Sequence, residues 1–395
     1  MKKLFMIALS LGYLHADLQL DKQIAGITML GFYGTDIEQN KQIQQELKYG
    51  LGGVILFDRN PQDKTKPKNI VDKEQLKKLN AQLQQYSNNS LLIGIDQEGG
   101  KIERLKSKMG FIHTPSAKEL GAKDDINATK QAYDALASEL HETGFTLDFA
   151  PVVDLDANPN NTVIVGNERA YGKSPEIVTK HAQIFVDSLK SHGIVSVLKH
   201  FPGHGSSLGD SHKGFVDSST TWKPDELKPF VDINTPMIMS AHIFLEQLDD
   251  KYPATLSKKI LTDKLRGEMG YKGAIISDDM QMGAIDDNFN RKKSIELALN
   301  AGIDMLLYAN QNGEEVSLKD IIKIVNELVA EGAVKKERIE VAYERIAHLK
   351  NEHKLNTSAD VNMTTAMLMD TNNSSKKKSH SKSLKKKKKV QVRVD

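Results

Sequence analysis

Four short segments of the chain concentrate the residue types that acid–base and nucleophilic chemistry require. Two carboxylates and paired glycines lie in residues 95–102, an arginine in 167–172, a lysine with three histidines in 199–212, and adjacent aspartates in 276–280. None of the 395 residues is a cysteine, which excludes thiolate metal sites, disulfides and cysteine nucleophiles. The chemistry that this sequence offers is therefore that of carboxylates, imidazoles and cationic side chains.

Asp278 lies at the end of a short apolar run, residues 274–276, that we expect to form a buried strand. An ionised carboxylate held rigidly there suits attack on an anomeric carbon, which gives a covalent glycosyl-enzyme. We expect Ser277 to orient Asp278 by a hydrogen bond, and alternation along the strand to send Asp279 toward the following loop or helix. Metal binding by the two carboxylates is an alternative, but no His-x-x-x-His pattern lies nearby, and we expect no metal.

The loop between residues 202 and 214 carries Asp210 and His212. One proline and four glycines make it too irregular for a helix, so we expect a long mobile loop that closes over a substrate. A carboxylate on one ring nitrogen fixes the tautomer of the histidine and raises the basicity of the other nitrogen. His212 is thus a candidate proton donor and acceptor, and an Asx-type turn with a solvent-exposed histidine is the alternative that the spacing leaves open.

Eight short apolar runs that alternate with helical patterns must position these side chains. The strands are expected at residues 27–32, 54–57, 91–95, 146–153, 194–198, 237–241, 274–276 and 304–308. Helices are expected over residues 74–85, 129–143, 175–191 and 256–269. Continuous apolar runs are typical of parallel strands buried on both faces. We predict an α/β fold, namely a (β/α)8 TIM-type barrel with a single catalytic domain. A doubly wound sheet is the alternative, and it is disfavoured because no Gly-rich dinucleotide fingerprint follows the first strand.

Polar residues follow seven of the eight expected strands, which is where barrel enzymes place their chemistry. They are Asp58, Arg59, Asp96, Asp154, Lys199, His200, His242, Asp278 and Asn310. A single aspartate or asparagine at such a position is often only a helix cap. Polar residues after seven of the strands together predict a polar cavity surrounded by the strand ends.

The two ends of the chain differ in composition from its body, residues 17–355, which we expect to be the catalytic domain. Residues 1–16 combine Lys2 and Lys3 with an apolar run, as in a secretory signal peptide. We therefore expect a periplasmic or secreted protein. An N-terminal strand or helix packed on the core, in a cytoplasmic protein, is the alternative.

Residues 356–395 lose hydrophobic periodicity and are expected to be a disordered basic tail. Ten bases and one acid follow residue 375, so the rest of the chain is acidic. Such a tail can contact an anionic membrane or cell wall electrostatically, and a merely solubilising terminus is the alternative. Its basic run has no aromatic residues for base stacking, so we expect no nucleic-acid partner, and we expect a monomer.

Together the four segments resemble glycoside hydrolase family 3, and in particular its β-N-acetylglucosaminidases, also called β-N-acetylhexosaminidases. The matching pieces run in order through residues 25–350 and are Asp96-Gln97-Glu98-Gly99-Gly100, Lys199-His200-Phe201-Pro202-Gly203-His204-Gly205, Asp210-Ser211-His212 and Ser277-Asp278-Asp279-Met280. Lys101 stands where such enzymes usually have an arginine.

The resemblance implies that Asp278 is the retaining nucleophile and that His212, assisted by Asp210, is the acid/base. It also implies sugar contacts from Asp96, Arg104, Arg169, Lys199 and His200. The implied activity is a cofactor-free, retaining exo-β-N-acetylglucosaminidase that removes terminal β-linked GlcNAc from peptidoglycan fragments in cell-wall turnover. The substrate would be a GlcNAc-containing glycan or muropeptide.

Three other functions compete with this interpretation. A β-glucosidase relative and a phosphorolytic relative would use the same fold and nucleophile. The Asp210-Ser211-His212 segment disfavours the β-glucosidase, because such relatives generally draw their acid from elsewhere. A non-catalytic cell-wall-binding protein is the alternative of another class, and the intact Asp278, Asp210 and His212 disfavour it.

Overall fold

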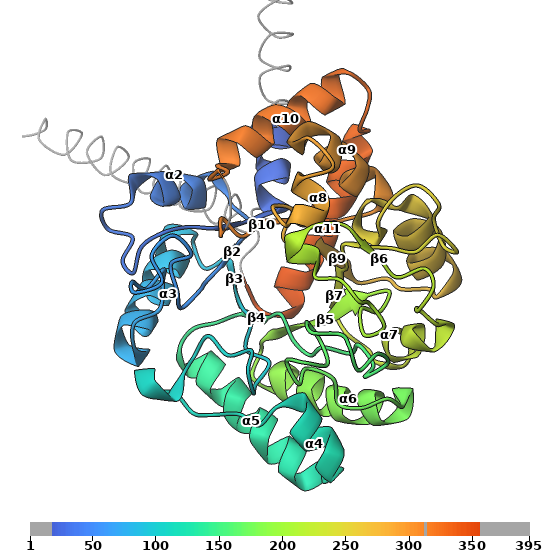
Figure 1. The fold of residues 1–395 in the computed structure, drawn as a ribbon. Helices are drawn as coiled ribbons and strands as arrows, with labels where there is room; N and C mark the ends of the chain where they lie inside the picture. Colours follow the sequence, from blue (N-terminus) through green and yellow to red (C-terminus); the bar gives the residue numbers. More distant parts are fainter. Residues whose placement is uncertain (1–17, 312–313, 356–395) are drawn as a thin grey trace, which may run out of the picture. The chain divides into compact units, whose positions relative to one another are not determined.

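Eight parallel strands form the centre of the protein in a computed structural model that describes residues 18–311 and 314–355 (Figure 1). In sheet order they are β10 (Leu306–Tyr308), β1 (Thr28–Gly31), β2 (Gly53–Ile55), β3 (Leu92–Ile95), β4 (Leu147–Asp148), β5 (Val195–Phe201), β7 (Met237–Ser240) and β9 (Ala274–Ser277). A parallel bridge between Ile276 and Met305 joins the two outer strands. The sheet therefore closes into the predicted barrel, and the open doubly wound sheet is excluded.

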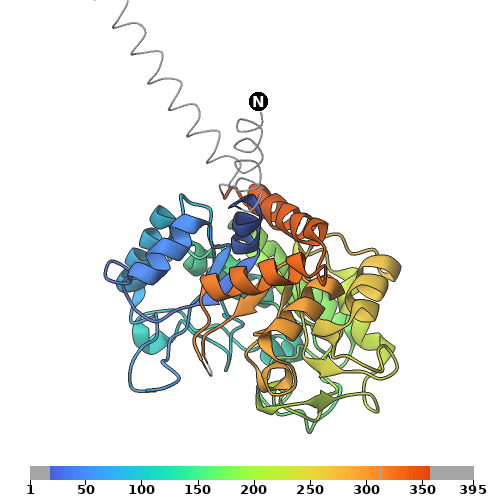
Figure 2. The same ribbon diagram turned by 90° about the horizontal axis from the view of Figure 1, so that it is seen from above.

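Helices and short turns surround the barrel, as the turned view in Figure 2 shows. Residues 18–26 are helical, and the α-helices that follow include α2 (Lys41–Tyr49), α3 (Lys73–Tyr86), α4 (Ala117–Lys123), α5 (Ile126–Glu142), α6 (Pro175–Ser191), α7 (Lys228–Asp232), α8 (Gly283–Asp286), α9 (Arg291–Ala301), α10 (Leu318–Ala330) and α11 (Lys336–Glu352). The short helices are η1 (Ser107–Met109), η2 (Ser211–Lys213), η3 (Pro224–Leu227), η4 (Ala254–Leu256) and the π-helix η5 (Lys259–Glu268). A small second sheet pairs β6 (Val216–Asp217) with β8 (Ile243–Phe244).

Most elements lie where the apolar periodicity predicts them, and two predictions need correction. The strand expected over residues 146–153 pairs regularly only at Leu147 and Asp148. Pro151 lies in the remainder and has no backbone N–H to give to a ladder, so a regular strand ends before it. The helix expected over residues 256–269 is divided into η4 and the π-helix η5.

Both ends of the chain carry predictions that lie outside the described residues. The signal peptide expected over residues 1–16 and the basic tail expected over residues 356–395 therefore stay predictions. Among the helices of the described segments, none is long and apolar enough to cross a membrane.

One buried carboxylate, that of Asp304, ties the last two strands to the helices that cover them. Its side chain is fully buried and accepts hydrogen bonds from Ile275 N at 3.0 Å, Arg338 Nη2 at 2.9 Å and Arg345 Nη1 at 2.9 Å. The guanidinium of Arg266 from η5 also pairs with it. Asp304 thus connects β9, the start of β10, η5 and α11 at the seam where the barrel closes.

Replacement of Asp304 should destabilise the protein strongly. We expect Asp304→Ala to lower the free energy of unfolding by about 3–5 kcal/mol, because three guanidinium groups then lose their buried partner. The exposed residue Asp232 at the end of α7 provides a control, and Asp232→Ala should stay within about 0.5 kcal/mol of wild type. Urea unfolding measures both, and equal stabilities of the two variants would contradict the role of Asp304.

Candidate active site

A cavity of about 710 Å³ is lined by side chains from the segments that follow the strands. The residues that the sequence predicts for the site all line it, namely Asp96, Arg104, Arg169, Lys199, His200, Asp210, His212 and Asp278. Three other strand-exit residues, Asp154, His242 and Asn310, are almost completely buried and do not belong to its lining. The structure therefore brings the predicted residues together and adds a layer of polar groups outside the lining.

Lys199, near the end of β5, is the centre of an ion-pair cluster in this cavity. Its ammonium lies 2.8 Å from Asp96 Oδ1 and 2.7 Å from Glu98 Oε1, and its side chain is only 3% exposed. Burial alone would lower the pKa of Lys199, but the charges of Asp96 and Glu98 raise it above its ordinary value. Lys199 therefore stays charged at neutral pH although it is buried.

Asp96 also pairs with a second cation, since Arg104 Nη2 lies 3.1 Å from its Oδ2. Burial would raise the pKa of Asp96, but Lys199 and Arg104 hold it well below its ordinary value. The side chains of Asp96 and Arg104 remain 18% and 28% exposed, so both can still contact a molecule in the cavity. Charge-assisted hydrogen bonds from such groups are well suited to sugar hydroxyls.

Glu98 is a member of this cluster that the sequence did not single out. Its carboxylate accepts two hydrogen bonds from Arg169, from Nε at 2.8 Å and from Nη2 at 2.7 Å. Burial would raise the pKa of Glu98, and Arg169 with Lys199 lowers it. The feature of the sequence that could have identified Glu98 is its position as the second carboxylate after β3. Arg169 is therefore clamped by Glu98, which fixes the direction of its guanidinium in the cavity wall.

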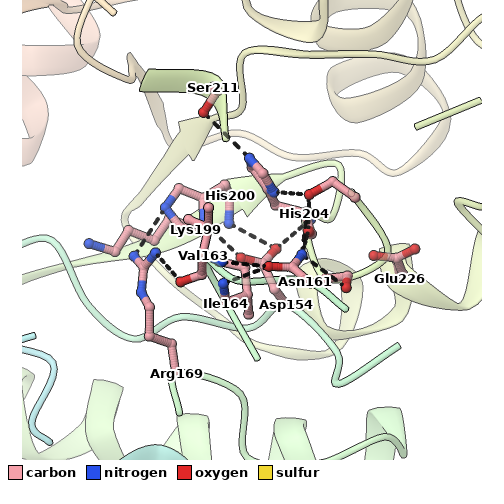
Figure 3. Close-up of polar contacts among 12 residues, drawn as sticks. Asp154, Asn161, Val163, Ile164, Arg169, Lys199, His200, His204, Ser211 and Glu226 are labelled. Carbon is pink, nitrogen blue, oxygen red and sulfur yellow. Dashed lines mark hydrogen bonds and ion pairs between the residues drawn. The ribbon is translucent and has the colours of Figure 1, made fainter. Parts of the chain in front are cut away.

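Asp154 holds the next residue of β5, His200, from outside the cavity lining (Figure 3). Its Oδ2 lies 2.7 Å from His200 Nδ1, and its Oδ1 accepts hydrogen bonds from the backbone N of His200 at 3.2 Å and of His204 at 2.7 Å. A carboxylate on Nδ1 fixes the orientation of the ring and leaves Nε2 for the cavity side. Arg169 Nη2 lies 3.4 Å from that Nε2, which connects Asp154 to the ion-pair cluster.

Asp278 directly follows β9 and lines the same cavity. Its Oδ1 accepts a hydrogen bond from the backbone N of Asp279 at 2.8 Å. Burial would raise the pKa of Asp278, but the nearby imidazoles of His242, His200 and His212 lower it below its ordinary value. An ionised carboxylate with a fixed position is what a nucleophile at this place requires.

Two neighbours of Asp278 have structural roles, and one of them corrects the sequence prediction. In the described part of the chain, Ser277 Oγ accepts its hydrogen bond from Leu307 N at 3.0 Å, so it ties β9 to β10 and does not orient Asp278. The Oδ1 of Asp279 accepts hydrogen bonds from Gln281 N at 3.1 Å, in the loop that follows, as predicted, and from Ala309 N at 3.0 Å, and Asp279 also contributes to the cavity lining. Over residues 18–311 and 314–355, no group of three or more histidine and carboxylate side chains is arranged to hold a metal ion.

In the predicted pair, Asp210 caps η2 and His212 lies within it, in the connection between β5 and β7. Asp210 Oδ1 accepts from His212 N at 3.1 Å and lies 2.9 Å from His212 Nδ1, so the Asx-type turn and the carboxylate–imidazole pair coexist. Burial would raise the pKa of Asp210, but its bonds to His212 lower it. His212 is 59% exposed, and its Nε2 is the ring nitrogen that remains for proton transfer.

Comparison with protein families identifies the chain. Residues 19–349 match the model of the glycosyl hydrolase family 3 N terminal domain, which covers most of the sequence. The chain belongs to glycoside hydrolase family 3. The family that the sequence motifs suggested and the predicted fold class are thereby confirmed.

Two named relatives are similar to the chain over most of its length. The chain is 34% identical to β-hexosaminidase A of Pseudoalteromonas piscicida over 330 residues, which are 77% of this chain and 54% of the relative. It is 35% identical to a β-hexosaminidase of Nitrosomonas eutropha over 298 residues, 72% of this chain and 81% of the relative. It thus spans about half of the first relative and most of the second.

A solved family 3 structure shares the fold. The β-N-acetylglucosaminidase from a Paenibacillus species superposes with a TM-score of 0.76 at 29% identity, over 86% of this chain and 63% of that one. The present chain therefore corresponds to less than two thirds of that protein.

Asp279 should make the stability of the protein depend on pH. Burial raises its pKa from 3.8 to about 6, so between these values the native state binds a proton that the unfolded chain releases. The contribution of Asp279 to stability therefore falls as pH rises through this window, and Asp279→Asn removes this contribution. Relative to wild type, the free energy of unfolding of this variant should rise by about 2–3 kcal/mol from about pH 4 to about pH 7.

Urea unfolding at the two pH values measures this difference. Asp232→Asn, at an exposed position on α7, is the matched control and should differ from wild type by the same amount at both pH values. A difference between Asp279→Asn and wild type that does not change with pH would contradict the assignment of a raised pKa to Asp279.

Proposed function

We propose that this protein is a retaining exo-β-N-acetylglucosaminidase that removes terminal β-linked GlcNAc from peptidoglycan fragments through a covalent glycosyl-enzyme. The observation that carries the proposal is the presence of a half-buried strand-end carboxylate, Asp278, and a carboxylate–imidazole pair, Asp210 and His212, in the lining of one cavity. The names of the family relatives, β-hexosaminidase and β-N-acetylglucosaminidase, support the choice of sugar.

In the first step, a carboxylate oxygen of Asp278 forms a bond to the anomeric carbon while the bond from that carbon to the leaving oxygen breaks. His212 gives its proton to the leaving oxygen, which takes the electron pair of the broken bond. Asp210 stabilises the protonated imidazole through the 2.9 Å contact on Nδ1. The lowered pKa of Asp278 keeps the nucleophile ionised.

In the second step, water attacks the same carbon and the bond to Asp278 breaks, which restores the carboxylate. His212 takes the proton of the attacking water, so the histidine ends the cycle in its starting form. Two displacements at one carbon retain the β configuration. The exposed position of His212 on a loop lets the proton donor lie beside the aglycone, while Asp278 reaches the sugar from the strand end.

The ion-pair cluster provides the sugar-binding part of this proposal. Asp96 and Lys199 keep opposite charges in fixed positions, and Arg104 and His200 lie in the same wall. Each can make a charge-assisted or neutral hydrogen bond to a ring hydroxyl or to the acetamido group. A volume of about 710 Å³ is in the range of pockets that enclose one small ligand.

The composition of the chain ends supports the cellular part of the proposal. Residues 1–16 would direct a monomeric enzyme to the periplasm or the outside of the cell, where peptidoglycan fragments are present. The lysine-rich residues 376–389 would hold it near anionic membrane or cell-wall polymers.

Hydrolysis of matched aryl glycosides tests the proposed activity. The full chain should hydrolyse an aryl β-N-acetylglucosaminide with a kcat/KM at least ~10²-fold above that for the matching β-glucoside, because a site that binds the acetamido group loses those contacts with glucose. The released sugar should be free GlcNAc, also in phosphate buffer. Asp278→Ala, prepared in parallel, gives the background of the preparation.

A preference for the β-glucoside would overturn the choice of sugar, and a sugar phosphate as product would overturn hydrolysis. Sugar binding without turnover of either glycoside would instead indicate a binding protein.

A further inference from the structure

His204 is a buried histidine that the proposed mechanism does not use, although it belongs to the cavity lining and contacts the loop that carries Asp210 and His212. It is 2% exposed. Its Nδ1 lies 2.6 Å from Ser207 Oγ, and its Nε2 lies 3.5 Å from Ser211 Oγ (Figure 3). The ring thus bridges the beginning of the loop after β5 and the first residue of η2.

Ser211 is the residue of η2 that turns inward. The side chains of its neighbours Asp210 and His212 are 24% and 59% exposed, whereas Ser211 as a whole is 3% exposed. Its hydroxyl is directed at His204, as Figure 3 shows. Any displacement of Ser211 therefore moves the two residues of the acid/base pair with it.

The backbone of His204 is fixed on the same carboxylate that holds His200. Asp154 Oδ1 accepts from His204 N at 2.7 Å, and Asn161 Nδ2 donates to His204 O at 2.8 Å. Asn161 Nδ2 also donates to Ser207 Oγ at 3.2 Å. The histidine ring consequently projects from a rigid, fully hydrogen-bonded base toward the loop.

Burial determines the protonation state of the His204 ring, and the hydrogen bonds determine which ring nitrogen carries the proton. Burial, and then the charge of His200, lowers the pKa of His204 to about 4, so the ring is neutral near neutral pH. Ser207 Oγ donates to His204 O at 2.9 Å, so it accepts the proton of His204 Nδ1. Nε2 then carries no proton, and it accepts a hydrogen bond from the Ser211 hydroxyl.

We propose that His204 and Ser211 form a latch that positions the acid/base loop over the cavity, so that His204 is a positioning residue for His212. This inference rests on the proposed function for the role of His212. A single hydrogen bond of 3.5 Å is weak enough to break when the loop moves, and its acceptor is rigid enough to restore one loop position. The latch thereby couples the wall that holds the sugar to the proton donor.

The variant Ser211→Ala tests the latch, because it removes one hydroxyl and leaves Asp210 and His212 in place. Ser218→Ala is its matched control, since Ser218 is a fully buried serine in the same connection between β5 and β7 whose hydroxyl has no hydrogen-bond partner among the described residues. His212→Gln shows the pattern that loss of the acid produces. Thermal unfolding of all variants checks that the fold is kept.

Two measurements report on the position and the mobility of the loop that carries Asp210 and His212. For a β-GlcNAc disaccharide, whose leaving group needs a proton, kcat/KM of Ser211→Ala should fall about tenfold or more, whereas for an activated aryl glycoside it should fall by less than about threefold. His212→Gln should show the same selectivity with a larger loss, and Ser218→Ala should match wild type. Amide hydrogen exchange of residues 208–214 should be faster in Ser211→Ala than in wild type and Ser218→Ala.

The outcomes separate the latch from the proposed function. Unchanged exchange and unchanged leaving-group dependence in Ser211→Ala would overturn the latch, even with an active enzyme. Faster exchange confined to Ser211→Ala would support the latch even if wild type hydrolysed no β-GlcNAc substrate, a result that would count against the proposed function alone.

Discussion

The site depends on the mutual compensation of buried charges around Lys199. Removing an ammonium or a carboxylate from water costs several kcal/mol, so none of these groups would stay charged and buried alone. Lys199 lies between Asp96 and Glu98, and Arg104 and Arg169 neutralise the outer sides of the two carboxylates. The cluster thereby joins the ends of β3 and β5 to the segment of residues 167–172, three parts of the chain that are distant in sequence.

This arrangement gives the cavity a rigid side and a movable side. Asp278 follows β9, and hydrogen bonds of Ser277 and Asp304 tie β9 to the β10 segment beside it. Asp154 fixes the ring of His200. His212, by contrast, is exposed on a short helix within a glycine-rich connection. A nucleophile benefits from one fixed position, whereas a proton donor that must admit a substrate and release an aglycone benefits from a loop that can leave. The contact of His204 with Ser211 lies at the boundary between the two sides.

Much of this could be read from the sequence, because the apolar runs that become strands also fix which residues follow them. Asp96, Lys199, His200 and Asp278 were found in that way, and the barrel then brings them together without further assumptions. The hydrogen-bond and ion-pair partners of these side chains could not be predicted from the sequence, since they depend on how separate loops approach one another. The clamp of Glu98 on Arg169, the support of His200 by Asp154 and the inward turn of Ser211 are of this kind. The sequence also assigned the Ser277 hydroxyl to its neighbour along the chain, whereas the neighbouring strand provides a backbone N–H in better position.

If Asp278 is the nucleophile, its carboxylate carries the sugar in the covalent intermediate, which can be trapped and located. A fluorinated β-GlcNAc donor that forms the glycosyl-enzyme faster than water removes it should label the wild-type protein with one sugar, detectable by mass spectrometry of the intact chain. Peptide sequencing should place the label on Asp278, and Asp278→Ala should remain unlabelled. A label on Asp279 or on another carboxylate, or turnover by Asp278→Ala at the wild-type rate, would show that Asp278 is not the nucleophile.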